Sequence, residues 1–128
     1  TALSVRLGIE WTIMLLGGGG NPDAWWEVNG DPSRHDGAGV GLALTRLAQG
    51  NRWLGVEIET TLDRPADAWY APIETVSNSE AGFERVYQGS ALLLSWLVTV
   101  EAGGVWSTSI RHIVRIAEER AVERRATT

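Results

Sequence analysis

Residues 92–100 read Leu-Leu-Leu-Ser-Trp-Leu-Val-Thr-Val, an apolar and β-branched run that predicts a strand. Side chains on a strand alternate between its two faces, so every second residue shares a face. The face expected to point inward carries Leu92, Leu94, Trp96, Val98 and Val100. Leu93 and Leu97 lie on the opposite face, which predicts a central strand covered partly on both sides.

The same alternation continues outward from this strand in both directions. In the opening segment the apolar positions are Val5, Leu7, Ile9, Trp11, Ile13 and Leu15. A hairpin is predicted from the strand that starts at Val40 and the strand at 52–62, reversed by a turn at Gln49–Asn51. Residues 106–116 form the last predicted strand.

The segments between these strands are rich in glycine, proline and polar residues. Turns are predicted at 63–67 and 88–90, on either side of two shorter strands at 68–77 and 83–87. Pro72 makes the first of these an edge strand or places it beside a bulge. Residues 24–39 are predicted to form one long loop, with room for a short edge strand at Trp25–Val28.

Strands at short spacing with glycine turns predict an all-β fold, an antiparallel sandwich or barrel of about seven strands. The domain is expected to cover residues 1–116. Residues 117–128 are expected to form a tail, either a short surface helix or a disordered end.

Composition limits the function. The chain has 128 residues, no cysteine and a net charge of −5, and its eleven basic residues are all arginine. An acidic chain without a long arginine cluster argues against a nucleic-acid partner. No apolar run approaches the length of about 18 residues that a membrane helix needs, and no signal peptide is visible, so no membrane partner is expected.

Seven Trp are the most unusual feature, against two Tyr and one Phe. Trp25 and Trp26 are adjacent, as are Trp69 and Tyr70, so each pair cannot easily face the same core. Exposed aromatic rings beside polar side chains are suited to sugars, because a sugar ring has an apolar face and a hydroxyl rim. The alternative is that these rings cover a neighbouring domain or fill a second layer.

Other chemistry has less support. Glu57 and Glu59 share one strand face and are expected to be solvated. A glycosidase needs two carboxylates in one cleft, and only a second acidic group, Glu74, Glu80 and Glu84, could supply them. His35 falls in a loop, and His112 is expected to be a hydrogen-bonded core histidine, so neither predicts a metal site. Oxygen ligands for calcium occur, without EF-hand spacing, at Asn21, Asp23, Asn29, Asp31 and Asp36.

Residues 68–90, AWYAPIETVSNSEAGFERVYQGS, resemble the C-terminal region of α-amylases and 4-α-glucanotransferases of glycoside hydrolase family 57. The resembling elements are the aromatic pair, Pro-Ile-Glu-Thr-Val-Ser, Ser-Glu with Gly-Phe-Glu, and Tyr-Gln-Gly-Ser. The opening strand, followed by Pro22-Asp23 and Trp25-Trp26, is also similar to this family. Residues 54–58 resemble the strand that precedes the motif in the family. The resemblance extends over roughly residues 3–116.

This resemblance implies a jelly-roll β-sandwich similar to galactose mutarotase-type domains. In that family the catalytic carboxylates lie in a separate N-terminal barrel, which has no counterpart in this sequence. It therefore implies a non-catalytic module whose partner is an oligo- or polysaccharide, with α-1,4-glucan the expected class. From the residues themselves, no cofactor and no metal are expected. The rival interpretation is an architectural domain that packs on a parent catalytic domain or forms a homodimer.

The residues expected to carry sugar binding fall into two groups. Those expected to stack on sugar rings are Trp25, Trp26, Trp53, Trp69 and Tyr70. Those expected to hydrogen-bond to hydroxyls are Asp67, Glu74, Glu84 and Gln88, and the last three, which belong to the motif, could equally hold a turn together.

Overall fold

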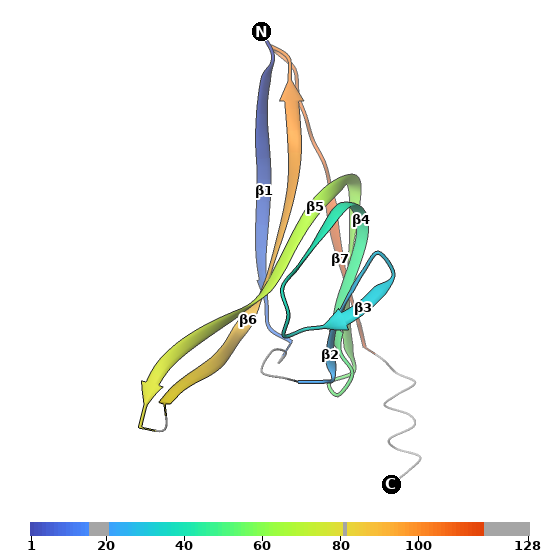
Figure 1. The fold of residues 1–128 in the computed structure, drawn as a ribbon. Helices are drawn as coiled ribbons and strands as arrows, with labels where there is room; N and C mark the ends of the chain where they lie inside the picture. The colour runs from blue at the N-terminus through green and yellow to red at the C-terminus, as the bar shows by residue number, and fades with distance from the viewer. Residues whose placement is uncertain (16–20, 81, 117–128) are drawn as a thin grey trace.

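The computed structural model describes residues 1–15, 21–80 and 82–116, and their regular structure is entirely β-strand. The strands are β1 (Leu3–Ile13), β2 (Ala24–Val28), β3 (Asp31–Arg34), β4 (Gly39–Asn51), β5 (Val56–Ser79), β6 (Gly82–Val100) and β7 (Ile110–Ile116). All pairs are antiparallel, in the order β1-β6-β5-β4-β2-β3 with β7 on β5 (Figure 1). The all-β antiparallel fold is confirmed, while the predicted tail at 117–128 lies outside the described residues.

The sheet has two halves that share the long strands β4 and β5. In the first half-sheet, β1, β6 and residues 67–79 of β5 lie with residues 39–44 of β4. In the second half-sheet, β3, β2 and β7 lie with residues 46–51 of β4 and 56–62 of β5. Buried side chains of both halves form one core, so the sheet folds over on itself as a sandwich with two shared strands.

A bulge turns β4 from one half-sheet into the other. Its register against β5 shifts between Gly41 and Leu44 and again before Arg46. Ala43 within this bulge has a φ of 51°, a left-handed conformation that a non-glycine residue adopts only under tertiary constraint. Bulges bend a strand and re-aim its side chains. Leu42 therefore points to solvent, while Leu44 two residues later is buried.

The turn predicted at 63–67 is wrong, because β5 runs through it as one strand. Pairing of β5 with β7 ends at Leu62, and pairing with β6 begins at Asp67. Pro65 lies between these two points. Because residue 65 pairs with neither β7 nor β6, the missing N–H of Pro65 removes no hydrogen bond to them. Proline is therefore tolerated at this point of the long strand.

The turn predicted at 88–90 is also wrong, because β6 is continuous from Gly82 to Val100. Instead, the register shifts between Ile73 and Glu74 of β5, which confirms the expected bulge beside Pro72. Gly89, with a φ of 156°, stands opposite Ile73 at this bulge. Beyond it, the β5–β6 hairpin projects away from the body of the domain (Figure 1).

The β4–β5 turn comes later than predicted. Residues 49–51 are the buried end of β4, and the chain reverses over residues 52–55. The Asn51 side chain organises this reversal, since its Oδ1 accepts hydrogen bonds from the backbone N–H groups of Trp53 (2.9 Å) and Leu54 (3.1 Å). Asn51 is the first residue of this Asx-type turn, so the chain reverses over the residues that follow it.

The long loop predicted at 24–39 contains a second hairpin. β2 confirms the short strand expected at Trp25–Val28, although it lies between β4 and β3 instead of at the edge. Asn29 and Gly30 form its turn, with φ values of 55° and 77°. An Asn-Gly pair with two positive φ values is the preferred two-residue hairpin turn, a signal that the sequence contained.

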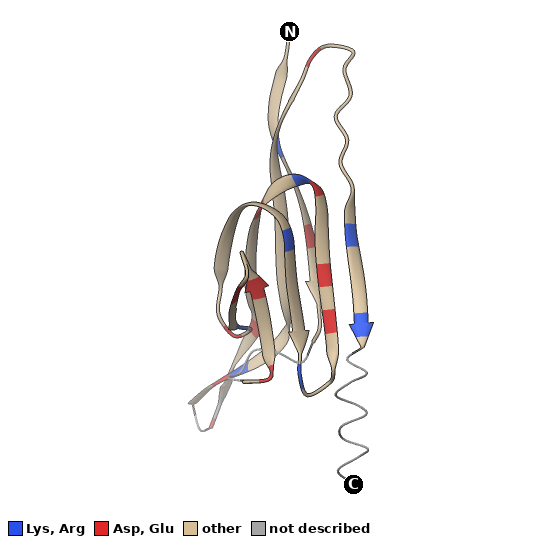
Figure 2. Ribbon diagram, turned by 90° about the vertical axis from the view of Figure 1, so that its right-hand side faces the viewer, with Lys and Arg blue, Asp and Glu red and all other residues tan. Residues whose placement is uncertain are grey.

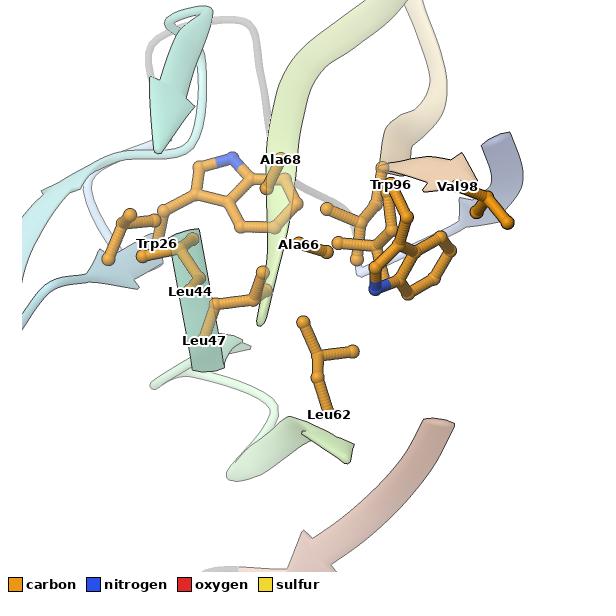
Figure 3. Packing of buried hydrophobic residues seen from close by; sticks show 11 residues of the cluster. Trp26, Leu44, Leu47, Leu62, Ala66, Ala68, Trp96 and Val98 are labelled. Carbon is orange, nitrogen blue, oxygen red and sulfur yellow. The ribbon is translucent and has the colours of Figure 1, made fainter. Parts of the chain in front are cut away.

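The core lies between the half-sheets (Figure 3). Trp26 enters it from β2 and Trp96 from β6, on opposite sides of Ala66 and Ala68 of β5. The inward assignment of Trp96 is confirmed, since it is 4% exposed and its indole Nε1 donates to the carbonyl oxygen of Arg64 at 3.2 Å. Small residues on β5 thus leave room for two indole rings to approach the centre.

Candidate functional site

A groove of about 470 Å³ crosses the outer face of the first half-sheet. Ladder pairing puts Trp69 of β5 between Val40 of β4 and Leu93 of β6. Leu93 in turn pairs with Glu10 of β1, so one row of side chains crosses four strands. We call this hollow the Trp69 groove. Its lining residues are Glu10, Ala38, Gly39, Val40, Trp69, Tyr70, Ala71, Ala91 and Leu93.

Trp69 is the exposed aromatic of this groove. Its neighbour Ala68 points into the core and is 0% exposed, so the alternation of β5 directs Trp69 outward, where it is 61% exposed. Ala71 and Ala91, which pair with each other beside it, leave space next to the large ring. The arrangement is a flat apolar ring along an open hollow, as expected for a surface on which a ring-shaped ligand stacks.

Polar groups lie next to Trp69 on the same face. Asp67, two residues earlier on β5, accepts a hydrogen bond from the backbone N–H of Ala43 at 3.0 Å. It also forms an ion pair with Arg6 of β1 at 3.6 Å, and Arg6 donates to the Ser95 hydroxyl at 3.2 Å. Asp67, Arg6 and Ser95 line a separate hollow of about 310 Å³ on this face. Of the predicted residues, the Trp69 groove itself therefore contains Trp69 and Tyr70.

Tyr70 faces the opposite way from Trp69, as predicted. Its ring lies against Trp26 in the core, with ring centroids 4.7 Å apart. Its other end lies over Gly39, where an added Cβ would be 2.2 Å from the Tyr70 hydroxyl oxygen. Gly39 is thus required for the close approach that forms the end of the Trp69 groove.

Replacing Gly39 with alanine is expected to lower the free energy of unfolding by about 1–3 kcal/mol, as overpacking in a filled site does. Tyr70 cannot yield easily, because its ring is held against Trp26. Chemical denaturation measures the change. Gly37→Ala is the matched control, since a Cβ there would come no closer than 3.8 Å to its neighbours. Equal stability of the two variants would show that Tyr70 does not need this glycine.

Trp26 is a correction to the predicted site. It is 0% exposed, so no sugar ring can reach it. The cause is that residues 24–28 form a strand, whose alternation sends Trp25 outward and Trp26 inward. Trp26 stacks on His35 with ring centroids 4.9 Å apart and belongs to the core cluster.

Trp25 lies in a separate cleft on the second half-sheet. This cleft has a volume of about 280 Å³ and contains two carboxylates, Glu27 and Glu57, and the guanidinium of Arg52. The Arg52 Cζ atom lies 6.0 Å from the centre of the Trp25 ring. Glu57, which was expected only to solvate an outer face, therefore lines a cleft.

The remaining predicted residues do not join either hollow. Trp53 is 61% exposed in the 52–55 turn. Glu74, Glu84 and Gln88 belong to the projecting β5–β6 hairpin, where Glu74 pairs with Arg85 at 3.8 Å and the Gln88 side chain donates to the Thr75 hydroxyl at 3.2 Å. These contacts fit a role within the hairpin, the second of the two interpretations offered for the motif.

Sequence reasoning missed a buried polar cluster around His35, which is 0% exposed. Its Nε2 is 3.1 Å from Gln49 Oε1, and its Nδ1 is 3.3 Å from the Ser90 hydroxyl, which also bonds the Tyr87 hydroxyl. The cluster ties the end of β3 to β4 and to the β6 bulge. Only the strand pairing brings these residues together, so their spacing in the chain carried no signal.

Acidification is expected to destabilise the domain through this histidine. Burial lowers the pKa of His35, so below the unfolded value of about 6.5 the unfolded chain binds a proton that the folded one does not. The contribution of His35 to the free energy of unfolding is therefore fully present above pH 6.5. It is lost as the pH falls from 6.5 towards the lowered pKa of the folded state. Thermal midpoints between pH 7.5 and 5 measure this slope. His35→Gln should flatten it only in part, because partial desolvation of the His112 ring also lowers the pKa of that residue. An unchanged slope would exclude His35 as the cause.

His112 departs in part from its predicted place in the core. Its Nδ1 is 2.8 Å from the Thr60 hydroxyl, so it is hydrogen-bonded as expected. Its ring meets Trp11 edge-on, 4.7 Å between centroids, but the residue is exposed because β7 is an edge strand. Among residues 1–15, 21–80 and 82–116, no group of three or more His, Asp or Glu side chains could hold a metal ion.

Glu59 is held by two arginines on the second half-sheet. Arg46 donates to one carboxylate oxygen, and Arg115 of β7 donates to the other at 3.2 Å. These hydrogen bonds lower the pKa of Glu59, so it stays ionised and is unsuited to donating a proton. Figure 2 shows the acidic positions of β5 beside the basic positions of β7.

In the part of the chain described, no helix is long and apolar enough to span a membrane.

Comparison with known proteins identifies the family. A family model described as the C-terminal domain of α-amylase and 4-α-glucanotransferase matches residues 3–110. The chain belongs to this family. It is also 49% identical over 120 residues to a C-terminal portion of Alpha-amylase 1 from Dictyoglomus thermophilum, an overlap of 90% of this chain and 16% of that protein. No solved structure matches it.

The chain is thus a C-terminal amylase/glucanotransferase domain, and the resemblance seen in the sequence is confirmed. It spans only 16% of the length of its curated relative. The activity of a whole amylase therefore does not follow from this domain, and its role depends on the chemistry of its own surface.

Proposed function

We propose that this C-terminal amylase/glucanotransferase domain is a non-catalytic carbohydrate-binding module, formed by residues 1–116, and that the Trp69 groove binds α-glucan. The observation that carries the proposal is the exposed Trp69 ring along an open groove. Asp67 and Arg6, which form an ion pair, line a separate hollow on the same face. The ring offers apolar area to a sugar face, and the charged pair offers both an acceptor and donors to hydroxyls.

α-Glucan is the ligand class because the family and its relative are named for amylases and glucanotransferases. A non-catalytic role is supported by the acidic residues. Glu59 is tied to Arg46 and Arg115, and Glu74 lies near Arg85 on the projecting hairpin. Glycoside hydrolysis needs two carboxyl groups facing one bond. Glu59 and Glu74 belong to different parts of the fold, and of the two carboxylates in the cleft beside Trp25, Glu27 is already paired with Arg46 at 2.8 Å.

Intrinsic fluorescence of the seven Trp tests the proposal. The folded domain is titrated with maltoheptaose and, as a control of linkage, with cellohexaose. We expect a saturable change with maltoheptaose alone. A response to cellohexaose alone would overturn the ligand class, and no response to either sugar would overturn sugar binding.

A second candidate function is architectural. The face of β1 that continues the core-facing side of β6 is apolar but exposed. Its side chains are Leu3, Val5, Leu7 and Ile9, which are 65%, 44%, 41% and 39% exposed. They form an apolar row at an edge strand, the kind of surface that packs on a parent catalytic domain or on a second copy. This role predicts a dimer by light scattering, or binding to the parent catalytic domain, without a fluorescence response to sugar. A monomer that responds to maltoheptaose supports the first function.

A further inference from the structure

The cleft beside Trp25 on the second half-sheet, called the Trp25 cleft from here on, has the features of a second ligand site. Trp25 stands between two hollows, of about 280 Å³ and 220 Å³, and both are lined by Trp25, Pro32 and Arg52. The indole lies across Gly50 of β4, where an added Cβ would be 2.6 Å from the ring atom Cζ2. One edge of the ring is therefore fixed against backbone, while space remains on either side of it.

The polar groups around this ring include both acceptors and a donor. Glu57 pairs with Gly50 in the ladder and is half-buried at the cleft. Glu27 is held by Arg46 at 2.8 Å and also lines the cleft. Arg52 approaches the Trp25 ring at 6.0 Å. A fixed indole with carboxylates and a guanidinium at its edge suits a hydroxyl-rich ring, whose hydroxyls both donate and accept.

This cleft and the Trp69 groove face away from each other. Trp25 belongs to the second half-sheet and follows Ala24, which is 2% exposed and points into the core. Trp69 belongs to the first half-sheet and follows Ala68, which is 0% exposed and points into the same core. Both rings are therefore directed outward, with the shared core between them.

We propose that the Trp25 cleft is a second saccharide-binding site and that the domain is bivalent, holding two glucan segments on opposite faces. This rests on the proposed function of the Trp69 groove. Bivalent attachment makes the second contact intramolecular once the first has formed. Long glucans that reach both faces, or particles that present many chains, are then held more tightly than short oligosaccharides.

Calorimetric titration with maltoheptaose, a short probe, counts the sites. The unmodified domain is expected to bind two molecules, and Trp25→Ala and Trp69→Ala are each expected to bind one. With soluble amylose, the unmodified domain should produce turbidity by linking chains, and each single variant should lose it. Circular dichroism and the thermal midpoint establish that each variant is folded.

Three results separate the possible failures. Binding of one molecule that Trp25→Ala leaves unchanged would overturn the second site and leave the Trp69 groove intact. Binding of none by the folded, unmodified domain would overturn the proposed function itself. If Trp25→Ala fails to fold, Arg52→Ala with Glu57→Gln tests the same cleft; two molecules still bound by that folded variant with unchanged affinity would overturn the second site.

Discussion

Replacing Trp26 with alanine is expected to lower the free energy of unfolding by about 3–5 kcal/mol, the usual cost of deleting a buried aromatic side chain. Trp26 is 0% exposed, stacks on His35 and lies against Tyr70. Its removal leaves a cavity between the half-sheets and exposes the buried histidine cluster. A single domain of this size has about 5–15 kcal/mol of stability, so a large share of the total would be lost.

Denaturant unfolding followed by circular dichroism measures this loss. Trp69→Ala is the matched control, because it removes the same side chain from the surface and should change stability by about 0.5 kcal/mol or less. A Trp26→Ala variant as stable as Trp69→Ala would contradict the placement of Trp26 in the core. It would restore Trp26 as a candidate for sugar stacking.

Trp69→Ala is expected to reduce the affinity for maltoheptaose at the groove by about tenfold or more while leaving the fold intact. Truncation of a central tryptophan at a binding site costs about 2 kcal/mol or more, and a factor of ten corresponds to about 1.4 kcal/mol. Val40 and Leu93 flank Trp69 in the same row, but neither offers a flat ring that could replace it.

Trp53→Ala is the control for this variant, because Trp53 is as exposed as Trp69, at 61%, but lies outside the groove. Titration calorimetry of both variants distinguishes a specific site from a general effect of losing a surface indole. If Trp53→Ala loses affinity and Trp69→Ala keeps it, the binding site lies at the β4–β5 turn and the assignment of the groove is wrong.

The strands could be predicted because alternation is a local property. The inward residues of β6 and the short strand β2 followed from period-two patterns. The predictions of turns at 63–67 and 88–90 were wrong because proline and glycine have two different effects on a strand. They can end the strand in a reversal of the chain, or they can allow a bulge or a change of partner within a continuous strand. Pairing with distant strands decides between these two outcomes.

The candidate site was only partly predictable for the same reason. Adjacent aromatics on a strand predict that one is exposed, and Trp69 with Tyr70 bears this out. For Trp25 and Trp26 the pattern could not say which one faces solvent before the strand and its partners were known. Glu10 reaches the groove, and His35 reaches Ser90, only through strand pairing over long sequence separations.

The most direct test of sugar binding on the Trp69 groove is a ¹⁵N–¹H correlation spectrum of the indole N–H groups during titration with maltoheptaose. Each of the seven Trp contributes one indole signal, and single substitutions assign them. We expect a saturable shift of the Trp69 signal, and none of comparable size for the buried Trp26 and Trp96. A Trp69 signal that stays fixed up to saturating sugar would contradict sugar binding in the groove.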